Sequence, residues 1–134
     1  MNLLEEGNEL RLDFTKLQKI AQTGLPVLPV VVQDVDSKEV LVVAYANKEA
    51  LEHSLKTGVA TFWSTSRNEL WIKGATSGDT LQLVDVRVNC EQNSLLYLVR
   101  MPGGGVCHTK DASGKTRKTC YYRSLKEGKL TFLK

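Results

Sequence analysis

Several stretches of the chain alternate between apolar and polar residues, which is the pattern of β-strands that are buried on one face. Residues 80–88 alternate most regularly, and residues 94–101 form a more continuously apolar run that predicts the central strand of a sheet. The five residues between the two runs are mostly polar and suit a tight connection. The two runs therefore predict a hairpin whose turn covers residues 89–93.

A second hairpin is predicted nearer the N-terminus. The apolar run 30–33 and the β-branched run 40–45 flank residues 34–39, which have the composition of a turn. Two further short strands are predicted at residues 60–63 and 70–73, where aromatic and branched apolar residues cluster.

The helical signals are clearest just after the second hairpin. Asn47 is a suitable N-cap, and Gly58 is a natural C-terminal stop. Between them, Leu51 and Leu55 lie four residues apart on one helical face. These signals predict a helix over about residues 48–57.

Residues 1 to 24 mix charged and apolar positions and predict a short N-terminal helix closed by Gly24. No repeat, low-complexity tract or linker divides the chain. The sequence therefore predicts an α+β fold with mainly antiparallel strands, in a single compact domain that comprises residues 1–134.

Composition limits the class of protein. With 134 residues, 42% hydrophobic content and a net charge of +3, the chain fits one soluble globular domain. The N-terminus lacks the basic start and apolar stretch of a signal peptide, and no apolar run is long enough to cross a membrane. Three cysteines without an export signal favour a reducing compartment, so we expect a cytoplasmic protein with no membrane partner.

The three cysteines lie in segments whose composition suits a metal-binding or catalytic site. Cys90 lies in the predicted turn, Cys107 follows three glycines and precedes His108, and Cys120 precedes two tyrosines. Three thiolates could hold one zinc ion and leave its fourth position free. Spacing alone does not establish such a site, because free cysteines are most often buried as small hydrophobes. On the same basis His108 could simply order the glycine loop.

Hydroxyls, glycines and cations gather in turns in the middle of the chain, at residues 64–67 and 73–79. A phosphate is bound by backbone N–H groups, hydroxyls and a forked guanidinium, all of which these turns supply. The signal is weak because ordinary turns have the same composition. The densest basic patch, residues 115–118, suits either a solvated loop or an anionic ligand.

Taken in order, these segments resemble the phosphoribosyl-AMP cyclohydrolase family. The resemblance covers roughly residues 26–123, which leaves residues 1–25 as an N-terminal extension. The matching segments, taken together in this order, are far more specific to the family than any one of them. The matching positions are Gln33-Asp34, residues 44–51, Gly58, Trp63-Ser64, Ser66-Arg67, Leu70-Trp71, Lys73-Gly74, residues 76–78, the hairpin around Cys90, residues 107–109, and Cys120 with Arg123.

This resemblance implies an enzyme of histidine biosynthesis that hydrolyses the N1–C6 bond in the adenine ring of 1-(5-phosphoribosyl)-AMP. It implies that Cys90, Cys107 and Cys120 hold a zinc ion that activates water, and that His108 transfers a proton between this water and N1. It also implies an intertwined homodimer in which both subunits supply zinc ligands. The resemblance implies that four residues bind the phosphates of the substrate: Arg67, Lys73, Thr76 and Ser77. It implies that Trp63, Ser64 and Gly78 also bind the substrate.

The chain departs from the family pattern at several positions. Thr65 replaces one of two arginines, and Ala75 replaces a glutamate. Asn89, Glu91 and Asn93 stand where the family has three aspartates that resemble a magnesium site. Because Mg²⁺ relies on carboxylate charge, we expect this cluster to bind it only weakly.

An insertion, residues 110–118, lengthens the segment between Cys107 and Cys120, and it moves no essential residue if it loops outward. The departures leave open a divergent paralogue that keeps zinc but has another substrate or no catalysis. The basic insertion leaves open a non-enzymatic zinc module that binds RNA. RNA is the least favoured partner because no aromatic residue of this segment precedes Tyr121. We therefore expect a phosphorylated nucleotide, rather than a nucleic acid, as the partner.

Overall fold

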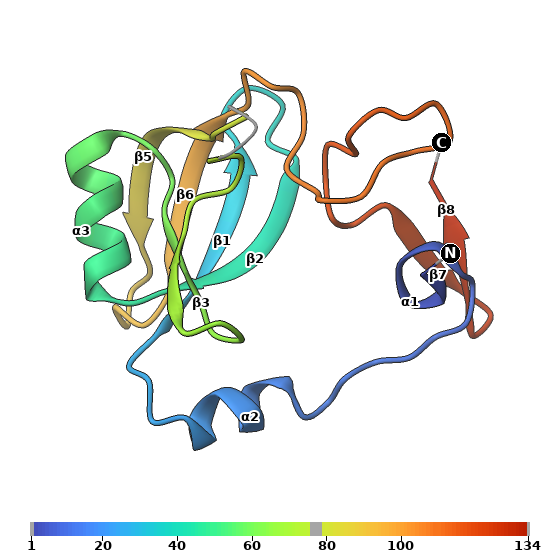
Figure 1. Cartoon of the computed structure of the whole chain (residues 1–134), viewed down its shortest axis with the longest axis horizontal. Helices are drawn as coiled ribbons and strands as arrows, with labels where there is room; N and C mark the ends of the chain where they lie inside the picture. The colour runs from blue at the N-terminus through green and yellow to red at the C-terminus, as the bar shows by residue number, and fades with distance from the viewer. Residues whose placement is uncertain (1, 76–78, 134) are drawn as a thin grey trace.

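The computed structural model describes residues 2–75 and 79–133, and its centre is a four-stranded sheet in the order β2-β1-β6-β5 (Figure 1). Neighbouring strands are antiparallel except for β1 and β6, which are parallel. This arrangement confirms an α+β fold with mainly antiparallel strands, and it confirms both predicted hairpins. The strands of the sheet are β1 (Leu28–Asp34), β2 (Val40–Ala46), β5 (Gln82–Val88) and β6 (Leu95–Arg100).

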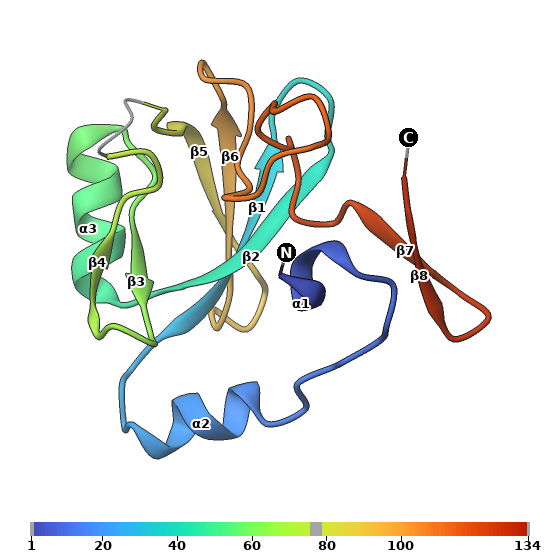
Figure 2. The same ribbon diagram turned by 45° about the vertical axis from the view of Figure 1, so that its right-hand side comes forward.

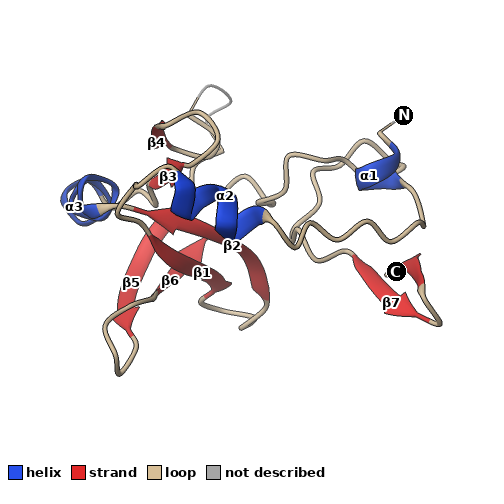
Figure 3. Cartoon of the chain, turned by 90° about the horizontal axis from the view of Figure 1, so that it is seen from below, coloured by secondary structure: helices blue, strands red, loops and turns tan. Residues whose placement is uncertain are grey.

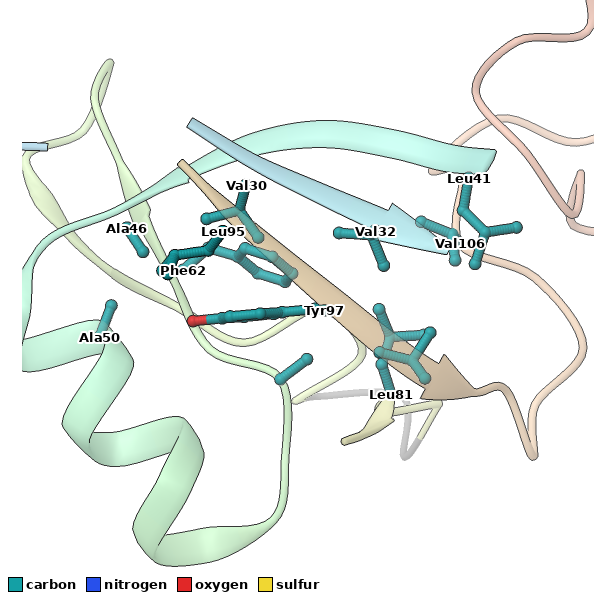
Figure 4. Packing of buried hydrophobic residues seen from close by; sticks show 12 residues of the cluster. Val30, Val32, Leu41, Ala46, Ala50, Phe62, Leu81, Leu95, Tyr97 and Val106 are labelled. Carbon is teal, nitrogen blue, oxygen red and sulfur yellow. The ribbon is translucent and has the colours of Figure 1, made fainter. Parts of the chain in front are cut away.

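The hydrophobic core lies on one face of this sheet, where alternate residues of the two inner strands point inward. Val30 and Val32 of β1 are fully buried there, as is Tyr97 of β6. The Tyr97 ring packs against Phe62, with the ring centroids 5.6 Å apart (Figure 4). The elements that cover this face are α3 (Lys48–Thr57) and the small hairpin of β3 (Phe62–Ser64) and β4 (Glu69–Trp71).

Helix α3 has the predicted ends. The side chain of Asn47 accepts a hydrogen bond from the Ala50 N–H, and Gly58 ends the helix with a φ of +73°. The buried residues of α3 are Ala50 and Ser54, whereas Leu55 is 62% exposed. Small side chains face the core because the Ser54 hydroxyl bonds directly to the backbone of Thr61. No helix among the described residues is long and apolar enough to cross a membrane.

The N-terminal region contains the predicted short helix before Gly24, α2 (Lys16–Gln22), and a second short helix that was not predicted, α1 (Leu3–Glu6). Gly24 follows α2 with a φ of +71°, as its predicted role requires. Helix α1 lies apart from α2, on the side of the molecule that carries a C-terminal hairpin that no sequence pattern predicted (Figures 2 and 3). Hydrogen bonds join the two, since Tyr122 donates to the Glu5 carbonyl and Arg123 to the Gly7 carbonyl. The strands of that hairpin are β7 (Arg123–Lys126) and β8 (Lys129–Phe132).

Candidate active site

Two of the three cysteines lie together beside the end of β6. Cys107 is buried, and its backbone N–H donates to the Arg117 carbonyl at 3.1 Å, which pairs the two sides of the segment between the cysteines. Cys120 lies next to the edge of the sheet, because its N–H donates to the Leu41 carbonyl of β2 at 2.8 Å. The two side chains are in contact, and burial together with the Cys107 thiol raises the pKa of Cys120 to about 12. A metal ion bound here would therefore have to displace a proton at neutral pH.

The run of three glycines lets the segment before Cys107 pack closely against its neighbours. A Cβ atom on Gly105 would lie 2.7 Å from the Arg117 carbonyl oxygen, and one on Gly103 would lie 2.3 Å from the Asp79 carboxylate. The backbone around Gly105 therefore excludes a side chain there, whereas a side chain at Gly103 would have to displace the Asp79 carboxylate. Val106, directly after the glycines, enters the core near Leu41 and fixes this end of the site (Figure 4).

Lys73 brings the predicted phosphate-binding turn to the thiols. Its ammonium donates to the Gly105 carbonyl at 2.8 Å and to the Asp79 carbonyl at 3.4 Å. The same positive charge lies close enough to Cys120 to favour ionisation of its thiol. Gly74 permits this fold, since its φ is +78° and a Cβ atom there would lie 2.2 Å from the Asp79 carbonyl oxygen. Of the predicted substrate-binding residues, three lie outside the described residues: Thr76, Ser77 and Gly78.

The other predicted substrate-binding residues lie on the β3–β4 hairpin. Arg67 is exposed, with its Nε 3.4 Å from the Ser64 hydroxyl and 3.6 Å from the Glu69 carboxylate. The indole N–H of Trp63 is buried and has no hydrogen-bond partner in the part of the chain that the structure describes. This hairpin therefore offers an exposed guanidinium and an unused donor.

His108 lies on the solvent side of the segment that carries Cys107. Its side chain is 77% exposed, and its Nε2 atom contacts the carboxylate of Glu5 in helix α1. No sequence pattern indicated this partner, because Glu5 belongs to the N-terminal extension.

Cys90 lies far from the other two cysteines within one chain. It is exposed in the turn between β5 and β6, whereas Cys107 lies beyond the opposite end of β6. Six residues of β-strand span roughly 20 Å, far more than a zinc ion bridges. Across residues 2–75 and 79–133, no group of three cysteine, histidine or acidic side chains is placed to hold a metal. One chain therefore brings two thiols to the candidate centre.

The polar side chains around Cys90 are bonded to each other. The Asn89 Oδ1 atom accepts from the backbone N–H groups of Asn93 and Ser94, each at 2.9 Å. The Asn89 amide donates to the Asn93 side chain at 2.6 Å, and the Asn93 amide donates to Glu91 at 3.2 Å. These contacts close the hairpin turn. Only one of the three side chains, that of Glu91, is a carboxylate, so the cluster fits a dedicated Mg²⁺ site poorly.

The insertion between Cys107 and Cys120 loops outward only in part. Its tip is an exposed turn in which the Asp111 carboxylate accepts from the N–H groups of Ser113 and Lys115. Its base is held by ion pairs, since Arg117 bonds to Glu6, and Lys118 lies 3.1 Å from a carboxylate oxygen of Asp34 in β1. Two of its four basic side chains are thus already paired. A cleft of about 1090 Å³ lies along it, lined by residues 110–112 and 115–119 and by aromatic side chains of residues 121, 122 and 132.

The fold and site define a small α+β protein with a pair of thiols, one buried and one half-buried, and a lysine-bearing turn at one end of a four-stranded sheet. A sequence model of the phosphoribosyl-AMP cyclohydrolase family matches residues 42–122, which is more than half of the chain and includes all three cysteines. The chain belongs to the phosphoribosyl-AMP cyclohydrolase family of enzymes.

Individual relatives agree with this assignment. The phosphoribosyl-AMP cyclohydrolase of Archaeoglobus fulgidus is 48% identical over 99 residues, which cover 74% of this chain and 85% of that protein. The protein of the same name from Hyphomonas neptunium is 42% identical over 128 residues, covering 96% of this chain and 86% of that one. The histidine biosynthesis bifunctional protein HisIE of Thermus thermophilus is 47% identical over 102 residues, which cover 76% of this chain and 44% of that protein.

Proposed function

We propose that this protein opens the adenine ring of 1-(5-phosphoribosyl)-AMP in histidine biosynthesis by hydrolysing the N1–C6 bond. The observation that carries the proposal is the Cys107–Cys120 pair, which lies beside Lys73 inside the segment matched by the family model. Thiols that can bind a metal and a cation that can bind a phosphate are the two groups that this reaction needs in one place.

Zinc fits the chemistry of the two thiols, and we propose Cys90 of a second subunit as the third ligand. A homodimer would supply it, because Cys90 is exposed and lies at the other end of β6. Bound zinc would supply an activated water near neutral pH. The altered cluster around Cys90 contributes at most weak Mg²⁺ binding in this proposal, and we assign it no step.

The remaining residues of the proposed site transfer a proton or bind the substrate. Hydrolysis adds the water oxygen to C6 and breaks the N1–C6 bond, so a proton from the water has to reach N1. We assign this transfer to His108, whose exposed ring is accessible to a ligand. Lys73 and Arg67 would bind the phosphates, together with Thr76 and Ser77. Trp63 and Ser64 would line the same site, with Gly78 allowing close approach.

An assay of ring opening tests the proposal, with 1-(5-phosphoribosyl)-AMP as substrate and the change in absorbance as the signal. We expect turnover that stops on chelation and returns with zinc, and about one tightly bound zinc per chain. Cys107→Ser should lose zinc and turnover together. The control Ser113→Ala, on the exposed tip of the same segment, should keep both.

Two results would argue against this function in different ways. Purified protein with well under half an equivalent of zinc would contradict the metal centre. Protein that holds zinc but does not turn over the substrate would favour the divergent paralogue.

A further inference from the structure

Helix α1 is tied to the segment between the cysteines by an ion pair with two parallel hydrogen bonds. The two terminal nitrogens of Arg117 donate to the two carboxylate oxygens of Glu6, at 2.7 and 2.9 Å. The side chain of Arg117 is 12% exposed and that of Glu6 is 28% exposed, so solvent weakens the pair only in part. The Arg117 hydrogen bond holds the pKa of Glu6 below its usual value, and Glu6 is therefore ionised at neutral pH.

Other contacts fix the orientation of the Arg117 guanidinium. It stacks over the Tyr122 ring, with its central carbon 4.1 Å from the ring centroid, and lies 5.4 Å from the centroid of Phe132. One of its nitrogens also donates to the Thr109 hydroxyl oxygen at 3.0 Å. A planar cation held on both its face and its edge has little freedom to rotate.

The Arg117 contact determines the direction of the Thr109 hydroxyl. Arginine can only donate, so the Thr109 oxygen accepts from it, and the single hydroxyl proton must point elsewhere. The Cys107 sulfur lies 2.9 Å from that oxygen, and both residues are buried. A Cys107 thiolate, the form that binds a metal, can only accept, so toward that form the hydroxyl proton points at the sulfur. A thiolate that accepts such a bond is held in one orientation, as metal ligands commonly are.

We propose that Glu6 is a positioning residue for Cys107, acting through Arg117 and Thr109. The inference rests on the proposed zinc centre, and it places one determinant of that centre outside residues 42–122, the segment that the family model matches. Without the Glu6 charge, the guanidinium loses its bidentate partner, the Thr109 hydroxyl loses its fixed direction, and the Cys107 side chain is held less firmly.

The test compares Glu6→Gln with Glu9→Gln. Glu9 lies on the same segment, but it is exposed and pairs only with Arg11 among the described residues. We expect zinc to pass to a chromophoric chelator about tenfold faster from Glu6→Gln than from the wild type, in line with the loss of other supports of metal ligands. Glu9→Gln should match the wild type.

Thr109→Val separates positioning from docking of the helix. It removes the hydroxyl and leaves the Glu6–Arg117 pair in place, so it should release zinc as fast as Glu6→Gln does. The double variant should be no faster than either single variant, because both break one chain of contacts. Equal rates of zinc release from Glu6→Gln and Glu9→Gln would overturn the proposal, and so would a Thr109→Val variant that releases zinc at the wild-type rate.

A second measurement does not depend on zinc. In metal-free protein, iodoacetamide should modify Cys107 faster in Glu6→Gln and Thr109→Val than in the wild type and Glu9→Gln, as measured by peptide mass spectrometry. If wild-type protein holds no zinc, the metal centre of the proposed function fails, and the alkylation rates alone decide the role of Glu6. Unchanged rates would overturn that role.

Discussion

Asp34 is a buried carboxylate that ties the segment leading to Cys120 back to the sheet. Its oxygens accept from the Asp36 N–H at 3.0 Å, the Ser37 hydroxyl at 2.9 Å and the Lys118 ammonium at 3.1 Å. Burial opposes ionisation, but these donors together hold the pKa of Asp34 below its usual value. The ionised form is thus favoured in the folded state.

The lowered pKa predicts how stability depends on pH. The contribution of Asp34 is complete above its unfolded pKa of about 3.9 and is lost as the pH falls through the lower folded value. Asp34→Asn should therefore lower the free energy of unfolding at pH 7, and its difference from the wild type should shrink below about pH 4. Urea unfolding at pH 7 and at acidic pH measures both. The exposed Asp36→Asn serves as the control, and an Asp34→Asn difference that is independent of pH would refute the argument.

The Ser54 hydroxyl of helix α3 bonds to Thr61, the residue directly before β3. The Ser54 oxygen accepts from the Thr61 N–H at 2.8 Å and lies 2.9 Å from the Ala50 carbonyl and 3.4 Å from the Tyr97 hydroxyl. All four residues are fully buried. The contact between helix and hairpin is therefore polar at its centre, although the core around it is apolar.

Removing that hydroxyl should be costly. Ser54→Ala leaves the Thr61 N–H buried without a partner, which costs about 1–3 kcal/mol of unfolding free energy. Thermal or urea unfolding measures the loss, and Ser66→Ala, which removes an exposed hydroxyl, should change stability little. A Ser54→Ala protein as stable as the wild type would mean that the helix can shift to satisfy Thr61 by another route.

The elements divide into those that local sequence predicts and those that distant contacts create. The two hairpins of the sheet and α3 follow from alternation and from Asn47 and Gly58, because these signals lie within each element. The β7–β8 hairpin was missed because its strands are short and charged, although Glu127-Gly128, both with positive φ, was an available turn signal. The pairing of Cys107 with Cys120 and Lys73 depends on packing between segments, which no local pattern encodes.

The whole molecule, in the proposed dimer, has two centres, each with Cys90 from one subunit and two thiols from the other. This arrangement predicts complementation between inactive variants. Cys90→Ser and Cys107→Ser should each be inactive, yet a mixed dimer would have one intact centre, so subunits exchanged at random should regain about a quarter of wild-type sites. Turnover after mild unfolding and refolding of the mixture measures this. The control is Cys107→Ser mixed with Cys120→Ser, which should stay inactive. Equal results from the two mixtures would contradict a shared centre.

The docking of α1 on the C-terminal hairpin also has a consequence for the order of folding. The Tyr122 hydroxyl bonds to the Glu5 carbonyl across 117 residues of sequence, and Arg117 bonds to Glu6 across 111. Closing so long a loop costs more entropy than closing the sheet hairpins, and on the ribosome residues 5 and 6 must wait until residues 117 to 122 have been made. The sheet can therefore form before helix α1 docks on the C-terminal hairpin. Docking of α1 would then be the last step of folding and the first to reverse, and hydrogen exchange should be faster in residues 3–9 than in β6.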